Sequence, residues 1–247
     1  MAKEKAYKLL AIQEGISNKK AKDLIDKGVV SVNGKKLLVA RGEISDSVNF
    51  KLKHIPNPKI IFEDDDILAV DKPAFLNASE VEKMFPQAVL LNRLDKETSG
   101  VMMLAKNEDF RQRAIKEFKK NKVYKEYVAV VEGKVVEEET INKPIHTIKG
   151  KTAKSKVDDQ LGKPALTKII PYMVEGNKSK LKIIIENGRT HQIRVHLQYA
   201  GYPIIGDLQY GRPSNQVQRT MLHSKVTRIF HYEFNAKEPK EFYHFGF

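Results

Sequence analysis

The first part of the chain has the apolar spacing of two short helices. We expect one helix over Tyr7–Glu14, which ends at Gly15. A second helix is predicted over Asn18–Lys27, because its apolar residues recur at i, i+3 and i+4 and Ser17 precedes it as an N-cap. Gly28 follows as a C-terminal stop.

A hairpin and a proline-rich linker follow these helices. Three of the four residues in the run 29–32 are Val, and Asn33-Gly34 suits the tight type I′ turn before residues 35–38. Pro56 and Pro58 then restrict the backbone and remove hydrogen-bond donors, which is typical of a linker. We therefore predict a small α/β domain over residues 1–56 and a larger domain over residues 57–247.

The larger domain is dominated by strand-like apolar runs. Two segments have helical periodicity instead, Glu108–Asn121 and Thr190–Ala200. Strands outnumber helices and do not alternate with them regularly, so we predict an α+β fold with a mixed, mainly antiparallel sheet. The expected strands are Lys59–Phe62, Ile67–Val70, Val101–Ala105, Tyr124–Val131, Leu166–Tyr172 and Leu181–Ile185.

Composition narrows the function classes. The 247 residues include 44 Lys and Arg against 31 Asp and Glu, a net charge of +13, so a polyanion is the expected partner. The absence of cysteine excludes disulfide scaffolds, thiolate metal sites and cysteine nucleophiles. Neither a membrane-spanning run nor a signal-peptide pattern is present, so we expect a cytoplasmic protein that binds no membrane.

Two stretches carry more polar detail than packing requires. RLDKETSG begins at Arg93, and GRTHQIRVHLQYAGYPIIGDLQYG begins at Gly188. The first resembles the catalytic signature of the RluA-type pseudouridine synthases, and the second resembles another long motif of that family. KEYVAVVEG at 125–133, GKPALTKI at 162–169 and LAVDKPA are similar to further family motifs in the same order.

The resemblance implies the pseudouridine synthase fold and roles for individual residues. Asp95 would be the catalytic carboxylate, Tyr127 would stack on the uracil and serve the transfer of its C5 proton, and Arg194 would pair with Asp95 and orient it. Arg93 would fill the gap left by a flipped nucleotide, and Leu222 would form an apolar wall of the uracil pocket. No cofactor and no metal are implied.

The order of elements in the smaller domain, with the sequence SNKKAKDLIDKGVVSVNGKKL, resembles the S4 RNA-binding module. Lys19, Lys20 and Lys22 on its second helix would then contact RNA phosphates. These contacts set affinity and salt dependence without reading sequence.

On local pattern alone, each site residue also has an ordinary structural interpretation. Asp95 fits a turn, Tyr127 fits a strand core and Arg194 fits a surface ion pair. His191 and His196 are spaced i, i+5, unlike the i, i+4 pair of a helical zinc site, so we expect packing or orienting hydrogen bonds from both.

The chain departs from the family at Asn92, where the usual residue is His. Asn keeps a donor and an acceptor but carries no charge. We predict an RNA pseudouridine synthase, active as a monomer on structured RNA, with large-subunit ribosomal RNA favoured over transfer RNA. The alternative is a non-catalytic S4-type RNA-binding or ribosome-assembly factor.

Overall fold

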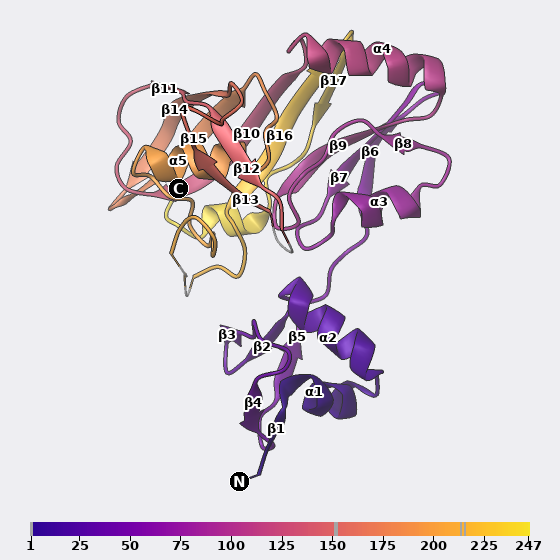
Figure 1. Ribbon diagram of the computed structural model, residues 1–247, viewed down its shortest axis with the longest axis vertical. Coiled ribbons are helices and arrows are strands. Elements are labelled where there is room, and N and C mark those ends of the chain that lie inside the picture. The colour runs from indigo at the N-terminus through magenta and orange to yellow at the C-terminus, as the bar shows by residue number, and fades with distance from the viewer. Residues whose placement is uncertain (1, 151–152, 213, 215) are drawn as a thin grey trace. The chain divides into compact units, whose positions relative to one another are not determined.

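The computed structural model describes residues 2–150, 153–212, 214 and 216–247, and its contacts divide the chain into two compact units. The first unit is Met1–Pro56 and the second is Asn57–Phe247. Figure 1 shows the elements of each unit.

The first unit packs two helices beside two small sheets. Helix α1 is Ala6–Glu14 and helix α2 is Asn18–Lys27. Strand β1 (Lys3–Lys5) pairs with β4 (Glu43–Ser45), and a second sheet has the order β3-β2-β5. The strands of that sheet are β2 (Val30–Val32), β3 (Lys35–Lys36) and β5 (Phe50–Leu52). The core of the unit is formed by Leu10, Ala21, Ile25, Val30 and Phe50, all buried.

The local signals predicted the two helices and the first hairpin of this unit, whereas strands β1, β4 and β5 were not predicted. The Ser17 hydroxyl accepts a hydrogen bond from the Lys20 amide at 3.2 Å, as an N-cap does. Gly28 ends α2 in the left-handed conformation. Asn33 and Gly34 both have positive φ, 50° and 75°, which is the geometry of a type I′ turn, so the predicted hairpin is confirmed.

Within its described residues, the second unit is built on a sheet of ten strands. The main path is β11-β14-β15-β10-β16-β9-β7-β6, with β17 paired to β16 and β8 paired to β9. Among the strand pairs described, β16 with β9 is parallel and the others are antiparallel. The mixed, mainly antiparallel α+β fold is therefore confirmed. The strands are β6 (Lys59–Glu63), β7 (Ile67–Lys72), β8 (Val89–Leu90), β9 (Ser99–Ala105), β10 (Tyr124–Glu132), β11 (Glu139–Asn142), β14 (Leu166–Glu175), β15 (Lys178–Ile185), β16 (Leu222–Ile229) and β17 (Tyr232–Asn235). A separate hairpin pairs β12 (Ile145–Ile148) with β13 (Lys154–Val157).

The helices of this unit differ from expectation at their ends. Helix α4 (Glu108–Lys119) stops two residues early, and Asn121 has a positive φ of 55°. Helix α5 (Gln192–Tyr199) starts two residues late, because His191 itself is left-handed at φ 57°. Helix α3 (Ala78–Met84) was not predicted, although Glu80 accepts a hydrogen bond from the Asn77 amide as in a capping box.

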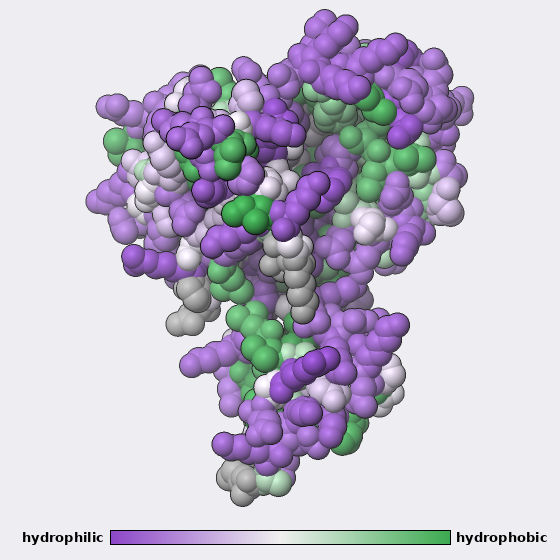
Figure 2. Space-filling model, viewed as in Figure 1, coloured by the Kyte–Doolittle hydropathy of each residue, from purple (hydrophilic) through white to green (hydrophobic). Residues whose placement is uncertain are grey.

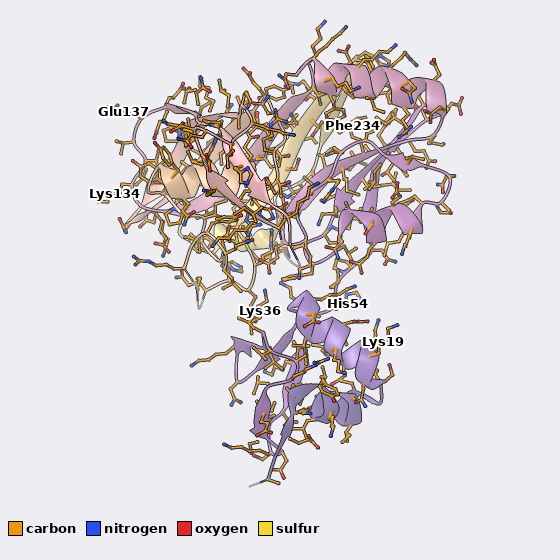
Figure 3. All side chains as sticks on the ribbon, viewed as in Figure 1. Lys19, Lys36, His54, Lys134, Glu137 and Phe234 are labelled. Carbon is orange, nitrogen blue, oxygen red and sulfur yellow. The ribbon has the colours of Figure 1, made fainter. Side chains whose placement is uncertain are left out.

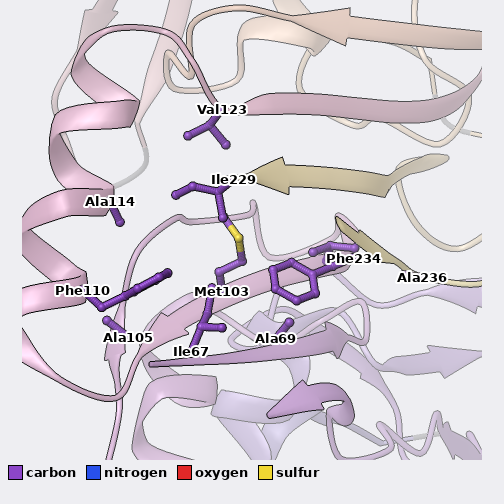
Figure 4. Close-up of a cluster of buried hydrophobic side chains, with 11 residues drawn as sticks. Ile67, Ala69, Met103, Ala105, Phe110, Ala114, Val123, Ile229, Phe234 and Ala236 are labelled. Atoms are coloured by element: carbon purple, nitrogen blue, oxygen red, sulfur yellow. The ribbon is translucent and has the colours of Figure 1, made fainter. Parts of the chain in front are cut away.

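A cluster of buried side chains fixes α4 against the sheet (Figure 4). Phe110 from α4 meets Met103 from β9, and Ile229 and Phe234 come from β16 and β17. All four are at most 2% exposed. This close packing holds α4 in a fixed position against strands β9, β16 and β17.

The outer surface of the second unit is mainly hydrophilic on the face shown in Figure 2, as its charge predicts. In the part of the chain that the structure covers, none of the helices has the length and apolar character needed to span a bilayer.

Candidate active site

Asp95 lies on the loop between β8 and β9. The Thr98 amide donates to the Asp95 carbonyl at 3.1 Å, which makes a tight turn. Below this turn, the fully buried Lys72 ammonium donates to the carbonyls of Pro73, Leu76 and Lys96 at 3.0, 2.8 and 3.3 Å. The predicted turn at Asp95 is thus real, and it presents the carboxylate instead of excluding a functional role.

Gly100 closes the same loop. Its φ is +112°, and a Cβ at this position would overlap the backbone of Ser224, its partner in the parallel pairing of β9 with β16. Glycine is therefore required where the loop enters the sheet, because other residues have both a conformational and a steric penalty there.

Arg194 joins Asp95 to a second carboxylate. Its Nη1 donates to Asp95 Oδ2 at 3.0 Å, while Nε and Nη2 donate to Asp207 at 2.6 and 2.8 Å. Burial opposes the charge on Arg194, but Asp207 and then Asp95 outweigh it, so the pKa of Arg194 is raised. Burial likewise acts to raise the pKa of Asp207, and the hydrogen bonds from Arg194 reverse this and lower it.

This arrangement orients the Asp95 carboxylate. Asp207 is fully buried and holds the guanidinium by two bonds, so Arg194 has one remaining edge, and it meets Asp95 there. Asp95 Oδ1 accepts no hydrogen bond from any residue in the described part of the chain. That oxygen is consequently the one available to a substrate.

Tyr127 lies on β10 and lines the same cavity as Asp95. Tyr127 is 7% exposed. Burial, together with the nearby Asp95 charge, raises the pKa of Tyr127 to about 12. The phenol is therefore protonated at neutral pH.

His191 contacts the site from the start of α5. Its Nδ1 is 2.8 Å from the Tyr210 hydroxyl, and its Nε2 is 3.9 Å from Asp95 Oδ2. The Tyr210 oxygen also accepts from the Ser155 amide at 2.7 Å, which leaves the Tyr210 proton free to point at His191. Burial first, and then the Arg194 charge, lower the pKa of His191 against the opposing pull of Asp95, so the ring favours its neutral form.

These side chains line one cavity of about 1360 Å³. Directly opposed residues of an antiparallel pair share a face, and Tyr127 faces Ile183 while Thr167 faces Ile185. Gln192 on α5 donates to the Thr167 hydroxyl at 3.1 Å, so α5 covers this same face. Of the described residues that line the cavity, six are Lys or Arg and three are Asp or Glu, a balance that suits an anionic substrate.

Of the other predicted site residues, Arg93 lines the cavity and Leu222 does not, and the three lysines belong to the first unit. Arg93 is exposed and lines the cavity. Leu222 is 3% exposed within β16 and is not among the described residues that line the cavity, whereas Thr220 is. Lys19 and Lys20 are exposed on α2 of the first unit, where Figure 3 labels Lys19. The Lys22 ammonium lies 4.1 Å from the centre of the Tyr7 ring.

Asn92 and His196 have structural contacts. Asn92 Oδ1 accepts from the Met103 amide at 2.7 Å, which anchors the β8–β9 loop to β9 without a charge. His196 is fully buried between the Thr167 hydroxyl and the Lys143 carbonyl, each at 2.9 Å, as an orienting hydrogen-bond role requires.

Sequence reasoning did not single out Asp207, Tyr210 or Lys72. All three fall inside quoted family-like stretches, GDLQYG and LAVDKPA, but no local spacing relates them to Asp95. Their roles depend on contacts between distant segments.

Comparison with known proteins identifies the family of this site. A family model described as RNA pseudouridylate synthase matches residues 66–199, more than half of the chain. The chain belongs to the RNA pseudouridine synthases.

Similar proteins and a solved structure support this family assignment. An uncharacterized RNA pseudouridine synthase of Helicobacter pylori is 48% identical over 240 residues, covering 97% of this chain and 99% of the relative. Ribosomal large subunit pseudouridine synthase D of Haemophilus influenzae is 30% identical over 221 residues, 76% of this chain and 68% of that one. The structure of human RNA pseudouridylate synthase domain containing 1 superposes with a TM-score of 0.66 at 28% identity, covering 76% of this chain and 86% of that one.

This synthase is therefore an enzyme of the RluA-like group that isomerises uridine in RNA, as its motifs predicted. The pseudouridine synthase reaction breaks the N1–C1′ bond of uridine and joins C1′ to C5, while the C5 proton is lost and N1 gains one.

Proposed function

We propose that the synthase modifies a uridine in large-subunit ribosomal RNA and that Asp95 is its catalytic carboxylate. Relatives named for the large ribosomal subunit support the target at 30% identity. The observation that carries the catalytic assignment is the Arg194–Asp95 bond of 3.0 Å beside a free carboxylate oxygen in a cavity that Tyr127 also lines.

In the proposed reaction, Asp95 acts on the flipped nucleotide with the oxygen that Arg194 leaves free. A fixed carboxylate at this position either attacks carbon or abstracts a proton, and both need the orientation that Arg194 supplies. Tyr127 offers its ring to the uracil. Since its pKa is about 12, the phenol can accept the C5 proton only if it gives its own proton to a base in the same step, and we assign that acceptor role to the Asp95 carboxylate in the same cavity.

Uridine reaches such a cavity only when it leaves its stack. Extrusion costs a few kcal/mol and least in a loop, so a structured RNA loop is the preferred substrate. We assign to Arg93 the role of filling the gap that the flipped nucleotide leaves, and its exposure and its place in the cavity lining support this.

The first unit fits an S4-like RNA-docking module of a cytoplasmic, monomeric enzyme. The exposed Lys19 and Lys20 on α2 supply cations for phosphates. Lys22 is partly engaged by the Tyr7 ring, so we assign it the smaller share. The non-catalytic alternative finds no support, because the carboxylate, the guanidinium and the phenol line one open cavity.

The test is to incubate the protein with unmodified large-subunit ribosomal RNA and, separately, with transfer RNA, and to map pseudouridine in each. We expect one or a few sites in the ribosomal RNA and no product from Asp95→Asn, with RNA affinity retained. Product confined to transfer RNA would refute the proposed target. Full activity of Asp95→Asn would refute the catalytic assignment.

A further inference from the structure

Two buried lysines near the site differ in how their ammonium groups are satisfied. Lys72 donates to three backbone carbonyls and is part of the scaffold below the catalytic loop. Lys125 is 8% exposed, and among the described residues its ammonium has a single acceptor, the Glu186 carbonyl at 2.7 Å. An ammonium has three protons, so Lys125 retains donors for a partner that the protein itself does not provide.

Lys125 is placed to meet that partner in the cavity. It lines the cavity together with Tyr127, two residues further along β10, so the two side chains lie on one sheet face about 7 Å apart along the strand. A nucleotide with its base on Tyr127 therefore has its sugar–phosphate backbone within reach of a lysine side chain.

Arg189 adds a second cation at this end of the cavity. Its Nε donates to the Pro164 carbonyl at 3.0 Å, and its guanidinium has no other hydrogen bond to a residue that the structure describes. Burial lowers the pKa of Lys125 to about 8, the Arg189 charge adds to this effect and Glu186 opposes it. Neither cation has a hydrogen bond to a carboxylate among the described residues, so both keep N–H donors that an anion in the cavity can accept.

We propose that Lys125 and Arg189 form a phosphate-binding subsite that holds an RNA phosphodiester next to the flipped uridine. The inference rests on the proposed function, in which Tyr127 contacts the uracil and Asp95 acts on the flipped nucleotide. It adds a backbone contact that neither the uracil nor the ribose supplies. Charge-assisted bonds of this kind fix the position of the strand without reading its sequence.

The test uses a hairpin cut from whichever RNA the wild-type enzyme modifies. One version is unchanged, and in two others a neutral methylphosphonate replaces the phosphate on the 5′ or the 3′ side of the target uridine. Lys125→Met keeps the shape of the side chain and removes its charge. The matched control is Lys182→Met on β15, because Lys182 faces Val128 and Ile170 on the opposite side of the sheet from the cavity.

We expect Lys125→Met to raise the RNA Kd about tenfold and to reduce the slope of log K against log salt by about 1. One methylphosphonate should weaken wild-type binding by a similar factor and leave Lys125→Met binding unchanged, since both remove the same contact. Lys182→Met should behave as wild type.

If each methylphosphonate raises the RNA Kd by the same factor in wild type and in Lys125→Met, the proposed subsite is wrong. An unchanged RNA Kd in Lys125→Met would also overturn it. If Lys125→Met does not fold, Arg189→Gln, a change of a partly exposed side chain, must show the same coupling, and its failure to do so overturns the proposal too. The hairpin comes from the RNA that the enzyme actually modifies. If that RNA is transfer RNA, the proposed ribosomal substrate is refuted, but the test of the subsite remains valid. Loss of product in Asp95→Asn reports on the catalytic assignment separately.

Discussion

Replacing Asp207 with Asn tests whether the positioning of Arg194 controls catalysis. The Asp207 side chain is fully buried, holds Arg194 by bonds of 2.6 and 2.8 Å, and accepts the amides of Gln209 and Tyr210 at 2.9 and 3.1 Å. Asn keeps one oxygen for those amides but removes the charge. Breaking a buried ion pair costs about 3–5 kcal/mol, and Arg194 retains Asp95, so we expect a loss of about 3 kcal/mol in the free energy of unfolding.

Catalysis should fall more than binding in this variant. Without Asp207, the guanidinium is free to shift towards Asp95, and a misplacement of about 1 Å costs about 100-fold in rate. The assay is single-turnover pseudouridine formation at saturating RNA, with the RNA Kd measured separately. We expect the rate to fall about 100-fold while the RNA affinity stays near that of wild type.

The stability difference should also depend on pH. Because the pKa of Asp207 is lowered below its ordinary value of 3.8, its contribution is complete above that value and is lost as the pH falls through the folded-state pKa. Urea unfolding should therefore show the largest gap between wild type and Asp207→Asn near neutral pH, and a narrowing gap below about pH 4.

The matched control is Asp159→Asn, an exposed carboxylate 3.7 Å from Lys143, where we expect a change below about 0.5 kcal/mol. Wild-type stability in Asp207→Asn, or an undiminished single-turnover rate, would refute the positioning argument.

Three further predictions concern the same loop and cavity. Arg194→Lys should lower the single-turnover rate about 100-fold with RNA affinity retained, because an ammonium cannot hold two carboxylates in one plane; a wild-type rate would contradict this. Since the pKa of Tyr127 is about 12, the single-turnover rate should not fall through ionisation of this phenol up to about pH 10. A fall in rate with rising pH below pH 10 that is absent in Tyr127→Phe would show that the pKa of the phenol is lower than this. Gly100→Ala should cost more than about 2 kcal/mol of unfolding free energy because its Cβ overlaps the Ser224 backbone, whereas Gly176→Ala, also at positive φ but in open space, should cost about 1 kcal/mol; equal losses in urea would argue against the overlap.

The amino-acid sequence by itself determined the features that depend on neighbours along the chain. The bounds of α2 follow from Ser17, the apolar spacing and Gly28, and the first hairpin follows from Asn33-Gly34. The stretch RLDKETSG indicated the chemistry through its resemblance to the family signature, whereas on local pattern alone Asp95 also fits a turn.

Tertiary structure decided the rest. Asp95 and Arg194 are 99 residues apart, and their bond depends on the sheet order that places the β8–β9 loop beside the start of α5. The left-handed His191 that delays α5, the second carboxylate at Asp207 and the single acceptor of Lys125 have no local signature. Helix caps and turns involve residues within about four positions of each other, whereas burial, charge pairing and unsatisfied donors exist only once distant strands have paired.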